Sequence, residues 1–102
     1  MSTVLTPLPN FGPKFSLGQL VATPAALAAM VSAEDSAENY LRRHLNGDWG
    51  DCGEEDSKAN DFALKAGDER LLSVYHLKDK TKIWIITEAD RSSTCVLLPS
   101  DY

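Results

Sequence analysis

The stretch Lys82–Leu98, KIWIITEADRSSTCVLL, decides the fold of this chain. Its first arm, Ile83–Ile86, consists of β-branched and aromatic residues, which suit a pleated strand. Alternation places apolar side chains on both faces of this arm, which is typical of a strand in the middle of a sheet. The polar segment 89–92 predicts a turn, and residues 94–98 return as a second strand that stops before Pro99. We therefore predict a β-hairpin whose first arm is buried.

Three helices are predicted ahead of the hairpin, over residues 25–31, 37–45 and 54–66. The first begins at Thr23–Pro24, because threonine caps a helix and proline suits its first position. Apolar residues at helical spacing indicate which side of each helix is buried. The residues expected on these buried sides are Leu27, Met30 and Val31, then Tyr40, Leu41, His44 and Leu45, and then Ala59, Phe62, Ala63 and Ala66.

Residues 70–78 alternate in the manner of a third strand, and residues 17–22 form a weaker candidate strand. Helices followed by strands in a run indicate an α+β fold with an antiparallel sheet. We predict about three short N-terminal helices packed on a C-terminal three-stranded antiparallel meander, with one short N-terminal strand as an optional addition. Residues 1–15 contain three prolines and are expected to form a flexible arm, with residues 16–102 as a single domain.

The composition narrows the classes of function. A formal net charge of −5 disfavours direct binding to nucleic acid, because phosphates repel an acidic chain. No run approaches the roughly 20 apolar residues of a membrane span, and the start of the chain lacks the pattern of a signal peptide. Two cysteines are too few for a disulfide framework, so reduced thiols are favoured and a Cys52–Cys95 pair stays open. We expect a cytoplasmic protein without a cofactor.

Acidic side chains crowd into the loop 48–53 and the start of the next helix. Their spacing does not match an EF-hand, and acids at a helix start also stabilise its dipole, so we predict no metal site. Trp49 lies between two glycines, where it either locks the loop onto the core or contacts a partner. We predict no catalytic residue, and a binding surface made of Asp48, Trp49, Asp51, Glu54, Glu55, Asp56, Asp90 and Arg91.

The acidic residues and the histidines also allow two alternative functions. Nine of the fifteen acidic residues fall between Glu34 and Asp61, so one face could imitate the phosphates of a nucleic acid and inhibit a DNA-binding enzyme. A small metal-dependent hydrolase would instead need at least two of its acids and histidines to converge in a pocket. The candidates for that pocket are His44, Asp48, Asp51, Glu55 and His76, although structural roles are favoured for both histidines.

Three segments of the chain carry a resemblance to a known family: LGQLVATPAAL (17–27), RRHLNGDWGDCGEEDSKAND (42–61) and KIWIITEADRSSTCVLLP (82–99). They resemble short bacterial proteins carried by plasmids and integrated elements. This resemblance implies an accessory protein of a mobile genetic element, without a particular reaction. With no credible catalytic set in the chain, we expect it to act by binding another protein. A homodimer is also open, because Trp84 makes its strand apolar on both faces.

Overall fold

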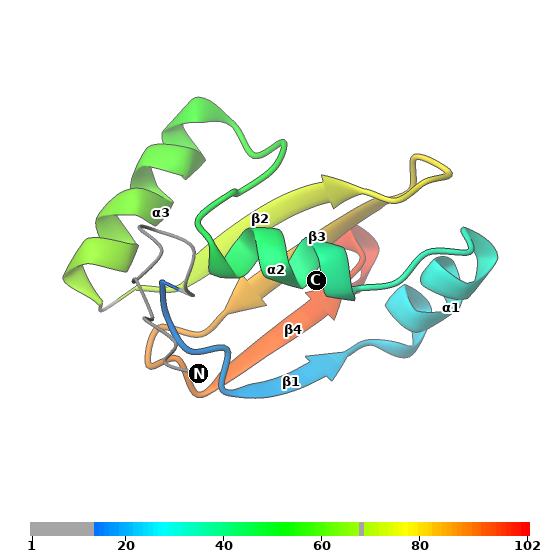
Figure 1. Ribbon diagram of the computed structural model, residues 1–102, viewed down its shortest axis with the longest axis horizontal. Helices are drawn as coiled ribbons and strands as arrows, with labels where there is room; N and C mark the ends of the chain where they lie inside the picture. The colour runs from blue at the N-terminus through cyan, green and yellow to red at the C-terminus, as the bar shows by residue number, and fades with distance from the viewer. Residues whose placement is uncertain (1–13, 68) are drawn as a thin grey trace, which may run out of the picture.

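The computed structural model describes residues 14–67 and 69–102, which form a mixed α+β structure (Figure 1). This confirms the predicted fold class. Residues 1–13 of the predicted arm, with Phe11, lie outside the described residues. The elements are β1 (Gln19–Ala22), α1 (Pro24–Ser32), α2 (Glu38–Leu45), α3 (Glu54–Ala66), β2 (Leu71–His76), β3 (Lys82–Thr87), β4 (Ser93–Leu97) and the 3₁₀ helix η1 (Pro99–Asp101).

The sheet has four strands in the order β1-β4-β3-β2. The predicted meander of β2, β3 and β4 is antiparallel, with Ile85 of β3 lying opposite Ser73 of β2 and Val96 of β4. The N-terminal strand is a full member of this sheet and pairs with β4 in parallel. A purely antiparallel, three-stranded sheet was therefore too simple a prediction. Because three helices and two strands lie between β1 and β4 in the chain, the chain can cross back so that β4 runs beside β1 in the same direction.

The core lies between one face of the sheet and the helices, and Figure 1 shows α2 crossing in front of the strands. Ile83 and Ile85 of β3 are fully buried on this face. They contact the alanine-rich side of α1, including Ala26 and Met30. The interior position of β3 confirms the buried first arm of the hairpin. The helices supply a cover for this face of the sheet.

The buried sides of α1 and α3 agree with the predicted ones only in part. In α1, Met30 is buried as predicted, but Ala26 is buried in place of Leu27 and Val31, which are 53% and 78% exposed. In α3, Ala63 is buried as predicted, but Asn60 is buried in place of Phe62, which is 66% exposed. The small Ala26 and the polar Asn60 are buried because close contact with the sheet and side-chain hydrogen bonds set the rotation of the helices. Apolar spacing alone does not include those constraints.

The outer edge of β2 is closed by groups that do not belong to a strand. The Asn60 side chain donates to the Leu72 carbonyl (2.6 Å) and accepts from the Leu72 amide (3.0 Å). Further along, Val74 donates to the Trp49 carbonyl (3.0 Å) and accepts from the Asp51 amide (2.7 Å). These bonds replace the neighbouring strand that an open edge would otherwise recruit.

Candidate functional site

Asp48 of the predicted binding surface is held by a cation. Arg43 on α2 donates from Nε to its Oδ2 at 2.7 Å, and the same guanidinium lies 4.6 Å from the centre of the Tyr75 ring. The hydrogen bond from Arg43 lowers the pKa of Asp48 below its usual value. The carboxylate is half-exposed but already partnered, so it contributes little free negative charge.

Two other acids of the predicted surface also have side-chain partners, whereas Glu55 and Asp56 are exposed. Asp51 Oδ2 is 2.8 Å from His76 Nδ1, and Glu54 is 3.2 Å from Lys58 one turn along α3. Alternating charges weaken the continuous negative track that a nucleic-acid mimic needs. Across residues 14–67 and 69–102, no three His, Cys, Asp or Glu side chains are grouped to hold a metal ion. Of the hydrolase candidates, Asp51 and His76 meet each other, but both side chains are exposed and neither lines the pocket between α3 and the sheet.

Trp49 is part of the core. Its side chain is 5% exposed, it stacks on Phe15 at 6.4 Å between ring centres, and its indole Nε1 donates to Asp61 Oδ1 at 2.9 Å. Gly50 follows with a φ of +71°, and a Cβ there would lie 2.0 Å from the Val74 carbonyl oxygen. The glycine thus lets the loop run against β2 while the indole fills the space beneath it. Trp49 serves to hold the loop in place and offers no surface to a partner.

His44 is fully buried and lies in a hydrogen-bonded network that spans α2 and three strands. Its Nδ1 is 2.5 Å from Ser73 Oγ, and its Nε2 is 2.9 Å from Thr87 Oγ1. Thr87 Oγ1 is 2.7 Å from Thr94 Oγ1, which in turn donates to the Leu17 carbonyl at 2.8 Å. Burial lowers the pKa of His44 to about 4. The imidazole is therefore neutral near pH 7.

The network determines which nitrogen of His44 carries the proton. Thr94 donates its only hydroxyl proton to the Leu17 carbonyl, so in the Thr87–Thr94 hydrogen bond Thr87 must be the donor. His44 Nε2 must then donate to Thr87, which leaves Nδ1 of the neutral ring to accept from Ser73. The pair of Ser73 and His44 resembles a nucleophile and its base, but both side chains are fully buried. We assign the network a structural role.

Asp90 and Arg91 stabilise the turn between β3 and β4. Asp90 Oδ1 accepts from the Ser92 amide at 3.0 Å. Arg91 Nη1 donates to three backbone carbonyls of the turn and of the segment before β2, at 2.7 to 3.1 Å. Its Nη2 donates to the Ala63 carbonyl near the end of α3 at 3.2 Å. A guanidinium with this many internal acceptors holds the turn against α3 and is not available to a ligand.

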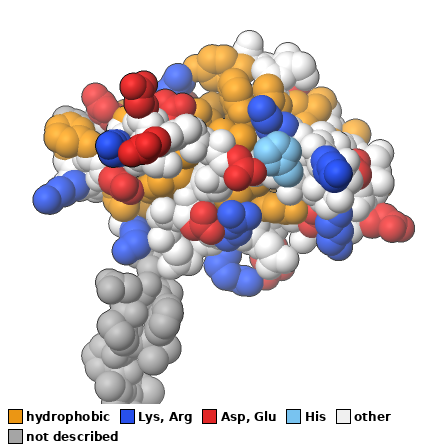
Figure 2. All heavy atoms as spheres, turned by 90° about the horizontal axis from the view of Figure 1, so that it is seen from above, with side chains coloured by type: hydrophobic (Ala, Val, Ile, Leu, Met, Phe, Trp, Pro, Cys, Tyr) orange, Lys and Arg blue, Asp and Glu red, His pale blue; other side chains and the backbone are white. Residues whose placement is uncertain are grey.

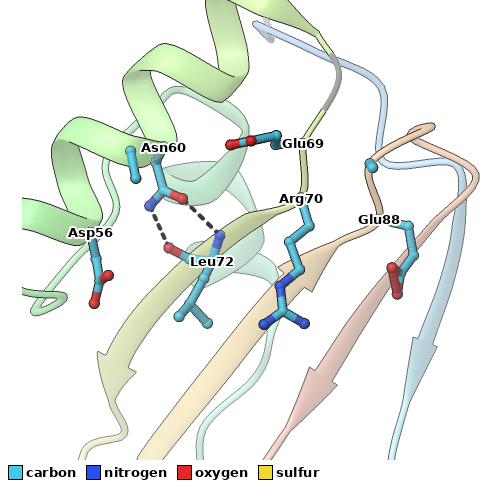
Figure 3. Close-up of a pocket in the computed structure, with 8 residues that line it drawn as sticks. Asp56, Asn60, Glu69, Arg70, Leu72 and Glu88 are labelled. Carbon is cyan, nitrogen blue, oxygen red and sulfur yellow. Dashed lines mark hydrogen bonds between the residues drawn. The ribbon is translucent and has the colours of Figure 1, made fainter.

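A pocket of about 540 Å³ opens between α3, the start of β2 and the end of β3 (Figure 3). We call it the α3 groove. Three acids and one arginine surround a floor that includes Leu72, so the charged side chains of the lining carry a net charge of −2. The residues that line it are Asp56, Ala59, Asn60, Glu69, Arg70, Leu72, Glu88 and Ala89.

Only Asp56 of this groove was among the residues predicted to bind. The other residues come from segments far apart in the chain and meet because β2 and β3 are antiparallel. Leu71 lies opposite Thr87, so Arg70 before β2 and Glu88 after β3 fall at the same end of the sheet. The sequence alone does not show that these residues meet, because their proximity depends on the register of β2 against β3.

The second face of the sheet begins beside the α3 groove and carries an apolar surface. Trp84 lies half-buried on this face, 5.7 Å from the ring of Tyr102. Arg70 covers the other side of that ring at 5.5 Å and donates from Nη1 to the tyrosine hydroxyl. The three helices do not cover this face within the described residues, although Ile86 and Leu97 on it are buried, at 8% and 6% exposed. Figure 2 shows hydrophobic side chains gathered on one side of the molecule.

No protein-family model, curated protein or solved structure matches this chain in comparisons with known proteins. The resemblance to plasmid-borne bacterial proteins therefore remains an expectation. Among the described residues, no helix has the length and apolar character needed to span a bilayer.

Proposed function

We propose that this protein is a small acidic accessory protein that acts by binding a protein partner in the α3 groove. The single observation that carries the proposal is the groove itself, an open pocket of about 540 Å³ with a net negative lining beside an uncovered apolar face. The resemblance to short proteins of mobile genetic elements supports an accessory role.

Charge favours a basic segment as the bound part of the partner. Asp56 approaches from α3, while Glu69 and Glu88 lie on the strand side, so a lysine or arginine would meet carboxylates on two walls. The aliphatic stem of such a side chain fits against Leu72 and Ala59. The net charge of −5 also attracts a basic partner at long range.

The adjoining apolar face supplies the contact area that charge alone does not. Trp84 and Tyr102 form an aromatic pair, and Tyr102, which is 68% exposed, contacts Arg70 of the groove. Aromatic residues of this kind are frequent anchors in protein interfaces. Together the groove and the aromatic pair offer both the specificity and the burial that a stable complex requires.

A charge reversal in the groove tests the proposal. Affinity capture with the wild-type chain should recover a defined partner, and Glu88→Lys should reduce its recovery at least about tenfold, since a like charge replaces an attractive one. The substitution leaves the fold intact because Glu88 uses only its backbone groups in the turn.

The matched control is Glu54→Lys on the outside of α3. Glu54 forms an ion pair with Lys58 and does not line the groove, while both variants change the net charge from −5 to −3. We expect Glu54→Lys to recover the partner as well as the wild type does. Equal recovery by all three chains would exclude the α3 groove as the binding site.

A further inference from the structure

The strand β1 forms one edge of the sheet and presents free backbone groups. Its amides at Gln19 and Thr23 face β4, where they donate to Ser92 (2.9 Å) and Val96 (3.0 Å). Because the direction of backbone groups alternates along a strand, the N–H and C=O of Leu20 and Ala22 point away from β4. Within residues 14–67 and 69–102, no strand lies on that side.

The backbone groups at the two edges of the sheet differ in whether they are hydrogen-bonded. The outer edge of β2 is closed by the Asn60 side chain and by the loop at Trp49–Asp51, and Tyr40 Oη also donates to the His76 carbonyl at 3.3 Å. The edge at β1 has no proline, charge or bulge, which are the usual protections of a free edge. Within the described residues, the edge at β2 is therefore closed and the edge at β1 is available for pairing with another strand.

The side chains around β1 point to a protein surface as its cover. Residues 15–33 contain no charged side chain, although a quarter of the whole chain is charged. Of the six large hydrophobic residues that are exposed in the described part of the chain, four lie in β1 and α1: Leu20 (50%), Val21 (41%), Leu27 (53%) and Val31 (78%). Apolar side chains beside unpaired backbone groups are the features that a second strand would cover.

We infer that β1 pairs with β1 of a second copy of this chain, antiparallel and about a two-fold axis at Val21. Leu20 then lies opposite Ala22 of the partner copy, and Ala22 opposite its Leu20, so that four backbone hydrogen bonds form. These are the groups that point away from β4. The two sheets join into one sheet of eight strands. Gly18, with a φ of +63°, and Pro24, which has no N–H, limit the pairing to this short segment.

A second copy fits this edge because the edge is complementary to itself. Two chains of net charge −5 repel each other over most of their surfaces, and the uncharged segment 15–33 is where they approach with the least repulsion. An isologous contact also pairs each free N–H of β1 with a free C=O of the second copy, and each free C=O with a free N–H. The α3 groove lies beside β2 at the opposite edge of the sheet, so this inference does not rest on the proposed function.

Measuring the molar mass in solution tests the inference. Light scattering should give the wild type twice the chain mass of 11.2 kDa. Val21→Lys places two like charges at the two-fold axis and should reduce the mass to that of one chain. Phe62→Lys is the control, because it places the same charge at another exposed hydrophobic residue, on α3, and this variant should remain dimeric.

A cysteine at the axis tests the register independently. Residues opposite each other at a non-hydrogen-bonded position have Cα atoms about 4.5 Å apart, within reach of a disulfide. Val21→Cys should therefore form a covalent dimer under mild oxidation, whereas Gln19→Cys should not. Both are made with Cys52→Ser and Cys95→Ser, since Cys95 lies beside position 21 in β4.

Three results would overturn the inference. The first is a wild type that is monomeric at every concentration tested, and the second is a Val21→Lys variant that stays dimeric. In that second case, loss of the dimer with Trp84→Lys would place the contact on the uncovered sheet face. The third result is cross-linking at position 19 as readily as at position 21, which would exclude the antiparallel register.

Discussion

At the scale of single residues, the buried polar side chains form a consistent chain of hydrogen bonds. His44, Ser73, Thr87 and Thr94 are all fully buried, yet each finds a partner in the network. Among the described residues, no buried side-chain nitrogen or oxygen lacks a hydrogen bond. A satisfied network specifies a unique arrangement of α2 against the sheet, whereas an unsatisfied one would be costly.

The network predicts a specific dependence of stability on pH. The pKa of His44 falls from 6.5 to about 4 on folding, so the unfolded chain binds more protons between these values. Stability is thus complete above pH 6.5 and is lost as the pH falls towards 4, by roughly 3 kcal/mol. Urea denaturation at a series of pH values would measure this loss, and His44→Gln should flatten the curve. An equally steep curve for His44→Gln would assign the loss to other groups.

At the scale of elements, the loop before α3 is shaped by its contact with β2. Gly50 has a positive φ, and a Cβ at this position would meet the Val74 carbonyl oxygen at 2.0 Å and the Tyr75 ring at 2.6 Å. Gly67 at the end of α3 has a similar φ of +75°, but nothing lies within 4 Å of its Cβ position. The two glycines therefore separate the cost of backbone strain from the cost of steric overlap.

Replacing these glycines should give different losses of stability. Gly67→Ala should cost about 1 kcal/mol, the usual penalty for a left-handed alanine. Gly50→Ala should cost about 3 kcal/mol, because the loop must also move away from β2. Thermal or urea denaturation of both variants measures the difference. Equal losses would show that the loop tolerates the added methyl group.

The rotation of α3 depends on Asn60, whose side chain bonds both backbone groups of Leu72. Asn60→Asp removes the donor to the Leu72 carbonyl and places a carboxylate where the side chain is only 4% exposed. We expect a loss of about 2 to 4 kcal/mol, since a buried charge without a donor partner is unfavourable. Asn39→Asp on the exposed side of α2 is the control and should be nearly neutral. Denaturation midpoints of both variants provide the comparison.

At the scale of the whole molecule, the two faces of the sheet differ in cover. Helices and Trp49 cover one face, while Trp84 lies half-buried on the other beside the exposed Tyr102. The α3 groove opens at the border of the uncovered face, and β1 lies at the far edge. The molecule thus separates a protected core from the two surfaces that we propose for binding.

Tryptophan fluorescence should report this difference between the faces. In Trp84→Phe the remaining Trp49 is 5% exposed, so its emission should be blue-shifted and weakly quenched by acrylamide. In Trp49→Phe the remaining Trp84 should emit at longer wavelength and be quenched more strongly. Similar quenching of the two variants would mean that a further segment or a second chain covers Trp84.

The sequence by itself determined the fold class, the central position of β3 and the bounds of the helices to within a few residues. Alternation in residues 82–86, the Thr23–Pro24 start and Gly67 at the end of α3 are local signals, and the Thr23 hydroxyl accepts from the Ala26 amide as such a cap should. Each of these features depends on residues that are close in the chain, so a local pattern is enough to predict it.

Only the tertiary structure decided the parallel pairing of β1, the rotation of α1 and α3, and the α3 groove. The predicted site placed Asp48, Asp51 and Asp56 on one surface, but Asp48 and Asp51 are bound to Arg43 and His76, and only Asp56 reaches the groove. These outcomes depend on hydrogen bonds between distant residues, such as Asn60 with Leu72. Such long-range contacts leave no periodic signal in the chain, which is why they became visible only in three dimensions.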